Sequence, residues 1–242
     1  MVAPQTADSS SAQEGTAGAV MKPATEPPGP HVTVDPGSAV TGGARSAVID
    51  RREAVALAGH RHDEDTARSG LSDPAASVRA TALGALERLD ALADGEVASS
   101  LADPDPAVRR RAVELTASRP SVVVAQLLDD PDDSVVEMTA WALGERGEHA
   151  AVGALSALAS MGSGHGDPLC REAAVAALGA IGEPTGLPAV LAALEDKPAV
   201  RRRAAAALAA FDGPAVEAAL RRCLEDRDWQ VRQVAEDLLA VE

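Results

Sequence analysis

One short segment of the chain gathers the side chains that most often bind metal ions. His60, His62, Asp63, Glu64 and Asp65 follow one another closely, and imidazole with carboxylate oxygens suits a divalent cation. The same composition is also typical of a turn between two helices, where charged side chains need no further explanation. We therefore predict no functional metal site in this segment.

Sequence motifs for other kinds of catalysis are absent. The sequence contains no Gly-x-Ser-x-Gly nucleophile motif, no P-loop and no Gly-x-Gly-x-x-Gly turn before a helix. Cys170 and Cys223 lie about fifty residues apart in helical patterns, which favours reduced thiols over a disulfide. We expect no catalytic residue and no cofactor.

Residues suited to binding are easier to find than catalytic ones. Trp141 is one of three aromatic residues in the chain, and a half-exposed tryptophan among small neighbours is a typical anchor of a protein interface. The alternative is that Trp141 folds over the adjacent part of the chain and fills a gap in the packing. The sequence leaves both open.

Paired arginines are a second group of candidate binding residues. They flank a middle segment that contains Glu137, Met138 and Glu172, and they are Arg51 and Arg52, Arg110 and Arg111, and Arg202 and Arg203. A helix face that is basic at intervals could hold an acidic or extended peptide by charge and spacing. The alternative is an ordinary solvated helix face.

The helices that position these residues follow a repeat of about 30 residues. An aliphatic residue or cysteine recurs near the start of a predicted helix at Ile49, Val78, Val108, Val135, Cys170, Val200 and Val231. Alanine usually follows four residues later and leucine eight residues later, as at Leu57, so one face of each helix is predicted to be buried. Because each unit of such a repeat buries its apolar face only against its neighbours, the pattern predicts a solenoid.

The turns and the first helices of the predicted pairs carry signals of their own. Acidic residues stand directly before the recurrent helices at Asp73, Asp103, Asp130 and Asp226, where we expect carboxylates to cap the helices. Apolar residues such as Val122, Leu127 and Leu128 predict the first helix of one pair. The connection 161–167 contains three glycines and His165 and is longer than its equivalents. Since extra loops of repeat proteins often make contacts, His165 is a candidate binding residue, although the loop could equally be merely tolerated.

The composition divides the chain into two parts and limits its partners. Residues 1–44 are rich in Pro, Gly, Ser, Thr and Ala without a period, which predicts a disordered tail before a solenoid at 45–242. The net charge of −15 disfavours nucleic acid and favours a basic protein partner. No apolar run long enough to span a membrane and no secretory leader is evident, so we expect a cytoplasmic protein without membrane contact.

The segments Leu101–Arg109 and Leu169–Gly182 resemble HEAT repeats. They are most similar to the short HEAT-like repeats first associated with phycobilisome lyases, and the resemblance extends over residues 45–242. It implies an all-α protein, a right-handed α-solenoid of about seven helical hairpins. It also implies an inter-repeat ladder of Asp73, Asp103 and Asp130 with Arg79, Arg109, Arg171, Arg201 and Arg232. Asp50 and Val136 stand where arginine is expected, so the continuity of the ladder is in doubt in the first and fourth units.

This resemblance leaves two kinds of function open. The first is a non-catalytic scaffold that binds a protein or peptide on its concave face through Trp141, Met138, Glu137, Arg110, Arg111, Arg202, Arg203 and His165. The second is a cofactor-handling protein, either similar to a bilin lyase or similar to deoxyhypusine hydroxylase, an oxidoreductase. The hydroxylase binds iron through His-Glu pairs, whereas this sequence has only the reversed pair Glu148-His149. We predict the scaffold.

Overall fold

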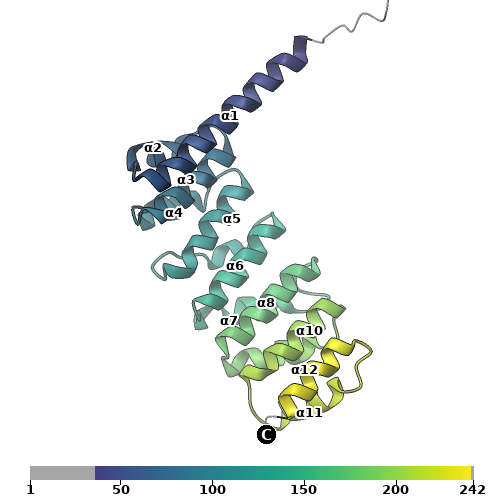
Figure 1. Cartoon of the computed structure of the whole chain (residues 1–242). Coiled ribbons are helices and arrows are strands. Elements are labelled where there is room, and N and C mark those ends of the chain that lie inside the picture. The colour runs from purple at the N-terminus through teal and green to yellow at the C-terminus, as the bar shows by residue number, and fades with distance from the viewer. Residues whose placement is uncertain (1–35, 241–242) are drawn as a thin grey trace, which may run out of the picture. The chain divides into compact units, whose positions relative to one another are not determined.

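The apolar residues of this chain are mostly alanine, valine and leucine, which form helices that can approach each other closely. The computed structural model describes the backbone of residues 36–240 and the side chains of residues 43–240. These residues form twelve α-helices and six short 3₁₀ helices, and no strand occurs among them (Figure 1). None of the described helices is both long and apolar enough to cross a membrane.

Seven α-helices carry the recurrent position, and we call them the second helices. They are α1 (Pro36–Arg61), α3 (Ala76–Arg88), α5 (Pro106–Leu115), α6 (Asp133–Glu145), α8 (Pro168–Ile181), α10 (Pro198–Ala207) and α12 (Trp229–Leu239). From α3 on, each packs against the next second helix of the chain (Figure 1). The first helices are α2 (Glu64–Ser69), α4 (Asp94–Ser100), α7 (Val152–Ala159), α9 (Leu187–Ala193) and α11 (Pro214–Cys223). The predicted all-α solenoid is confirmed.

The predicted tail lies largely outside the described residues. The predicted boundary at residue 45 falls within α1, which begins at Pro36. In the described part of the chain no first helix precedes α1.

The recurrent position is buried in every second helix except α1. Ile49 is 41% exposed and Leu57 is 45% exposed, whereas Val55 and Ala58 are buried. The predicted register of the first unit is therefore wrong by one residue. In the shifted register the position of α8 that is equivalent to Leu57 is Ala177, which packs closely against α6. Among the described residues no second helix precedes α1 to cover Leu57 in the same way.

The fourth unit lacks the first helix that the sequence predicts. A 3₁₀ helix, η3 (Ala125–Asp129), takes its place, and Val122 lies before it in an irregular segment. Arg146 holds this segment from α6, because its guanidinium donates hydrogen bonds to the carbonyl oxygens of Val122 at 2.8 Å and Pro120 at 2.9 Å. These bonds satisfy carbonyl groups that a regular helix would have bonded internally.

Glycine allows α6 to approach α8 closely. A Cβ atom added to Gly144 would lie 2.8 Å from the Cα atom of Ala177. We expect Gly144→Ala to lower the free energy of unfolding by about 1–3 kcal/mol, because it forces the two helices apart. Gly153→Ala in α7 is the matched control, since its Cβ atom would meet nothing within 4 Å, and it should raise stability by about 0.4–1 kcal/mol. Equal effects in urea denaturation would contradict this account of the contact.

The turn aspartates are not helix caps, contrary to the sequence prediction. Asp103 accepts a hydrogen bond from the backbone N–H of Asp105 at 2.8 Å, and Asp105 itself caps α5 by accepting from Ala107 at 2.9 Å. Asp103 also accepts two hydrogen bonds from Arg79, at 2.8 Å from Nε and 2.7 Å from Nη2. Asp130 and Asp226 have the same arrangement, with Asp132 and Asp228 as the capping residues.

These bidentate pairs form the expected ladder between consecutive repeats, with four corrections. Its rungs are Arg51–Asp73, Arg79–Asp103, Arg109–Asp130, Arg171–Asp196 and Arg201–Asp226. Arg51 continues the ladder where Asp50 suggested a break, because the register of α1 is shifted. Asp196, which the sequence prediction missed, completes the rung of Arg171, and Asp226, which was expected only as a helix cap, completes that of Arg201. The fourth correction is Arg232, which donates a hydrogen bond to the carbonyl oxygen of Asp226 at 2.7 Å and has no carboxylate partner among the described residues.

The ladder predicts a loss of stability in acid. A hydrogen bond from the rung arginine, as from Arg171 to Asp196, lowers the pKa of the aspartate against the opposing effect of burial. Because the folded pKa lies below the unfolded value of about 4, the stabilisation is complete above pH 4 and is lost as the pH falls through the folded pKa. We expect the urea midpoint, followed by circular dichroism, to be steady at pH 5–6 and to fall below about pH 4. A midpoint that stays constant down to pH 3 would contradict this expectation.

Candidate functional site

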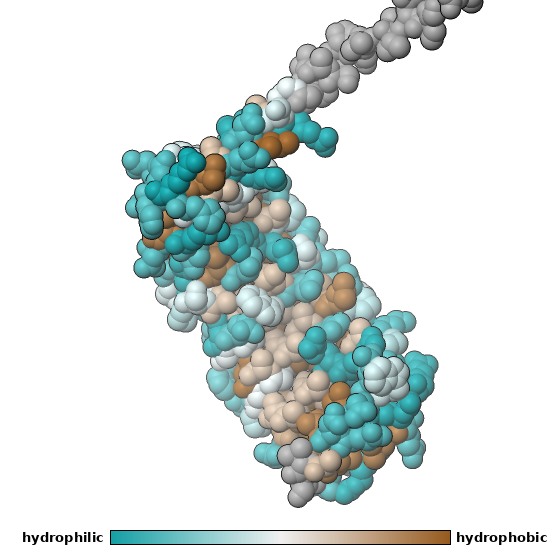
Figure 2. All heavy atoms as spheres, in the orientation of Figure 1, coloured by the Kyte–Doolittle hydropathy of each residue, from teal (hydrophilic) through white to brown (hydrophobic). Residues whose placement is uncertain are grey.

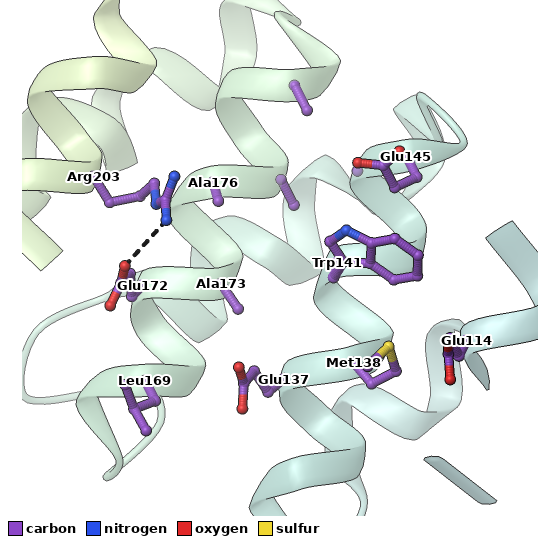
Figure 3. A pocket seen from close by; sticks show the side chains of 13 residues that line it. Glu114, Glu137, Met138, Trp141, Glu145, Leu169, Glu172, Ala173, Ala176 and Arg203 are labelled. Atoms are coloured by element: carbon purple, nitrogen blue, oxygen red, sulfur yellow. Dashed lines mark hydrogen bonds and ion pairs between the residues drawn. The ribbon is translucent and has the colours of Figure 1, made fainter. Parts of the chain in front are cut away.

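A groove lies on the exposed side of the second helices α6 and α8. Small residues form its floor, and they are Gly144, Ala173, Ala176, Ala177 and Ala180. Larger side chains from α5, α6, α8 and α10 surround this floor and enclose a volume of about 560 Å³ (Figure 3). Figure 2 shows apolar surface over this part of the chain, bordered by hydrophilic side chains. The groove exists because the repeat places alanine where a bulkier residue would fill the space.

Trp141 is the largest side chain of the groove. It is 41% exposed and lies on α6 at a position where the neighbouring second helices carry Glu114 and Ala176. The apolar side chain of Met138 lies one turn before it, and Leu169 lies across the groove at the start of α8 (Figure 3). The indole extends from α6 away from Ala173 and Ala176, so open space remains between the ring and the small residues of α8 (Figure 3).

Carboxylates surround this apolar surface. Glu137 and Glu145 lie on α6, four residues before and four residues after Trp141, so all three share one helix face. Glu114 and Glu172 line the groove from α5 and α8. The groove is thus an apolar surface with an acidic rim.

The predicted arginines do not make this groove basic. Arg203 lines it but pairs with Glu172, with 3.3 Å between Nη2 and Oε1. Arg111 pairs with Glu114 at 2.7 Å, and Arg202 lies 3.7 Å from Asp228. Arg110 is exposed, outside the groove, and has no ion-pair partner among the described residues. The structure thus brings together four of the predicted site residues, Glu137, Met138, Trp141 and Arg203, in one groove.

His165 lies in the turn before α8, away from the groove. It occupies the place that the ladder aspartates hold in other units, five residues before the recurrent position. Its Nδ1 accepts the backbone N–H of Asp167 at 3.1 Å, as the aspartates accept theirs. Val136, which is fully buried, stands at the position where other units carry the ladder arginine. Both partners of this rung are therefore replaced, the aspartate by an imidazole and the arginine by an aliphatic side chain, which explains how the fourth unit tolerates the predicted break.

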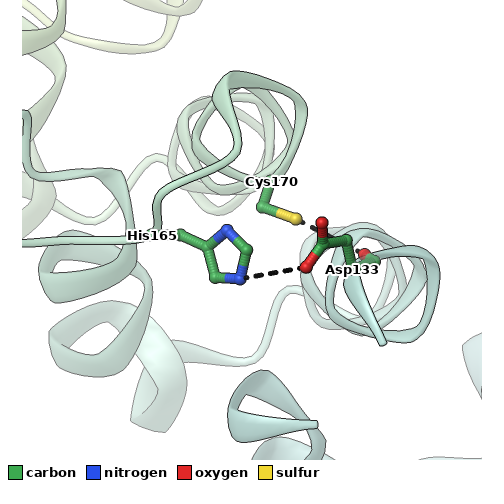
Figure 4. Close-up of side chains that lie close together, drawn as sticks. All are labelled: Asp133, His165 and Cys170. Atoms are coloured by element: carbon green, nitrogen blue, oxygen red, sulfur yellow. Dashed lines mark hydrogen bonds and ion pairs between the residues drawn. The ribbon is translucent and has the colours of Figure 1, made fainter. Parts of the chain in front are cut away.

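The replaced rung gathers three potential metal ligands that the sequence did not single out. Side-chain atoms of Asp133, His165 and Cys170 lie within 4.8 Å of one another (Figure 4). Because Nδ1 of His165 accepts from Asp167, the neutral ring carries its proton on Nε2, which faces Asp133 at 3.7 Å. The Cys170 thiol donates to the carbonyl oxygen of Asp133 at 3.4 Å, and burial, together with nearby carboxylates, raises its pKa to about 12. The histidine and the thiol are thus both engaged in the turn, and Cys170 is held as a protonated thiol, whereas the thiolate is the form that binds metal ions.

The segment around His62, by contrast, does not form a cluster of ligands. Asp63 caps α2 by accepting the backbone N–H of Thr66 at 3.1 Å. Hydrogen bonding from the Thr66 side chain, and then from its backbone, lowers the pKa of Asp63. The carboxylate thus has a structural role at a helix end.

Restoring the missing rung is expected to show strong coupling between two sites. Val136→Arg alone places an unpaired charge in a buried position and should destabilise the protein. Combined with His165→Asp, the arginine gains a carboxylate partner, so we expect a favourable coupling of about 1–3 kcal/mol in a double-mutant cycle of urea denaturation. If the effects of the two substitutions were simply additive, position 165 would not be equivalent to the position of a ladder aspartate.

A family model of HEAT repeats matches residues 96–165 and 157–240. These segments make up more than half of the chain. The chain belongs to the HEAT repeat family. No curated protein sequence matches it significantly.

Solved structures with the same fold include natural and engineered repeat proteins. The complex of CpcE and CpcF of phycocyanin lyase from Nostoc sp. PCC7120 is 24% identical, with a TM-score of 0.53 over 73% of this chain and 75% of that chain. An engineered protein is 20% identical, with a TM-score of 0.56 over 74% of this chain and 95% of that chain. The Escherichia coli protein YibA is 16% identical, with a TM-score of 0.53 over 73% and 69% of the two chains. At these identities the HEAT repeat protein shares a fold with them, and nothing further follows.

Proposed function

We propose that this HEAT repeat protein is a non-catalytic interaction module that binds a segment of a partner protein in the groove of α6 and α8. The observation that supports this most is the half-exposed Trp141 above a floor of alanine and glycine. Tryptophan is enriched among the residues that dominate binding energy, and a neighbouring apolar surface lets a partner side chain exclude water from it.

The rim of the groove indicates the charge of the partner segment. The lining side chains include four glutamates and one arginine, so an acidic segment would be repelled and a basic one attracted. This favours a basic partner and argues against the acidic peptide that the paired arginines suggested. The partner segment would combine apolar side chains for the floor with basic side chains for the rim.

The ladder supports this function by holding the groove in shape. Arg109–Asp130 ties α5 to the turn before α6, and Arg171–Asp196 ties α8 to the turn before α10. These two rungs brace the groove from its outer sides, while the close packing of Gly144 against Ala177 holds α6 to α8, where the rung is replaced. A preformed site loses less conformational freedom on binding. A rigid surface with spaced contacts is the usual mode of binding in repeat proteins.

The cofactor-handling alternatives gain no support from the arrangement of side chains. His149 of the reversed Glu148-His149 pair contacts Glu183 through Nδ1 at 3.0 Å in an exposed position. It belongs to no group of three potential ligands among the described residues. Nothing in the groove resembles a set of ligands for iron, and its acidic rim would repel the propionates of a bilin.

Selection of peptides from a random display library on the full chain tests this function without assuming the partner. We expect enriched peptides that bind the wild type and fail to bind Trp141→Ala. Trp229→Ala is the matched control, because Trp229 is exposed and lies outside the groove. Peptides that bind all three proteins alike, or a selection that enriches none, would overturn the proposed groove.

A further inference from the structure

We propose that an arginine side chain of the partner segment binds beside Trp141, where the indole, Glu137 and Glu145 hold it. This inference rests on the proposed function and names the chemistry of one subsite within it. It follows from the juxtaposition of an aromatic face, unpaired carboxylates and open space.

Helix geometry sets Trp141 between two carboxylates. Glu137, Trp141 and Glu145 follow one another at intervals of four residues on α6, and all three are exposed. Residues four apart lie about 5–6 Å from each other on a helix face. A cation stacked on the indole would thus have a carboxylate within reach toward either end of the helix (Figure 3).

The charges around the indole are not balanced by the protein itself. Glu114 and Glu172 have arginine partners, Arg111 at 2.7 Å and Arg203 at 3.3 Å. Glu137 and Glu145 have no ion-pair partner among the described residues. The two carboxylates nearest to Trp141 along α6 are therefore the ones left to attract an external cation.

The neighbouring helices leave room for a cation beside the indole. At the position equivalent to Trp141, α8 carries Ala176, and Ala173 and Ala180 lie one turn before and after it. A flat side chain can enter above these methyl groups and stack on the ring. Guanidinium is planar, stacks on aromatic faces and binds carboxylates in a bidentate manner, whereas ammonium is a compact, strongly hydrated charge.

Three peptides that differ in a single side chain provide the test. The probe is acetyl-Ala-Leu-Arg-Leu-Ala-amide, and the comparison peptides carry citrulline or lysine in place of arginine. Citrulline keeps the shape of arginine and removes its charge. The readout is the NMR signal of the Trp141 indole N–H in full-length Trp229→Phe protein, where it is the sole tryptophan signal.

We expect the arginine peptide to shift the Trp141 signal with an affinity at least about tenfold above that of the citrulline peptide. Lysine should be intermediate. The double variant Glu137→Gln with Glu145→Gln should reduce the preference for arginine to about two- to fivefold, the part that stacking on the indole supplies, and should weaken the citrulline peptide much less than the arginine peptide. Both positions are exposed, so the variant should fold. Added salt should weaken the arginine peptide more than the citrulline peptide.

Two results would overturn the inference. One is equal affinity for the arginine and citrulline peptides, and the other is a Trp141 signal that no peptide shifts. Failure of the proposed function is distinguished by the library selection, which presupposes no arginine. Peptides that depend on Trp141 but share no arginine would refute the arginine subsite and retain the groove.

Discussion

Replacing Asp196 by alanine is expected to lower the free energy of unfolding by about 3–5 kcal/mol. Asp196 accepts hydrogen bonds from Nε of Arg171 at 2.7 Å and from Nη2 at 2.8 Å. The exposed fractions of the two side chains are 7% for Arg171 and 1% for Asp196. Removal of the carboxylate leaves a guanidinium buried without its counter-charge, which is the costly half of a buried ion pair.

The matched control is the most exposed rung of the same ladder. Arg51 also forms a bidentate pair, with Asp73, but its side chain is 42% exposed. Asp73→Ala should cost clearly less than Asp196→Ala, since water can solvate the Arg51 guanidinium that remains. Urea denaturation followed by circular dichroism measures both variants. Similar losses in both variants would show that burial does not decide the energy of a rung.

Replacing Trp141 by alanine is expected to weaken binding of a selected peptide about 30-fold or more, which corresponds to at least about 2 kcal/mol. The free energy of unfolding should fall by only about 1–2 kcal/mol, because the side chain is 41% exposed and alanine is the better helix former. Isothermal titration calorimetry and urea denaturation give the two quantities on the same protein.

The comparison between affinity and stability separates the two roles of Trp141 that the sequence leaves open. Trp229→Ala, at the start of α12, should leave the peptide affinity unchanged. If Trp141→Ala lowered the stability by several kcal/mol and left the affinity unchanged, the indole would be a packing residue. A binding residue and a packing residue predict opposite results for affinity and for stability. The variant Trp141→Ala, with Trp229→Ala as its control, therefore decides between the two roles.

Much of the fold follows from local sequence patterns. Helix type and the buried stripe of five second helices from Val78 to Val200 depend on residues three to eight positions apart, and the period of about 30 residues is the recurrence of this local pattern along the chain. The short spacings are set by helix geometry, which every residue of the helix shares. The patterns fail in the register of α1, where Leu57 is exposed, and in the irregular segment held by Arg146.

The candidate site was less predictable than the fold. Trp141, Met138 and Glu137 could be singled out because they depart from the repeat. The acidic character of the groove could not, because Arg111 and Arg203 are neutralised by carboxylates whose direction depends on how the helices pack. A signal for His165 was present in its position five residues before Cys170, where other units carry aspartate.

The sequence by itself determined that this chain is a helical solenoid, because short spacings on helices fix which residues share a face. The ladder of arginine and aspartate was implied by the resemblance to HEAT repeats. Tertiary structure decided which carboxylate completes each rung, as Asp196 does for Arg171, and which charges remain free around Trp141. These pairings and free charges depend on contacts between side chains from neighbouring repeats. Moving an aspartate by one residue within a turn changes the arginine that it can reach. The family follows from the pattern of the chain, whereas the chemistry of its groove follows from packing.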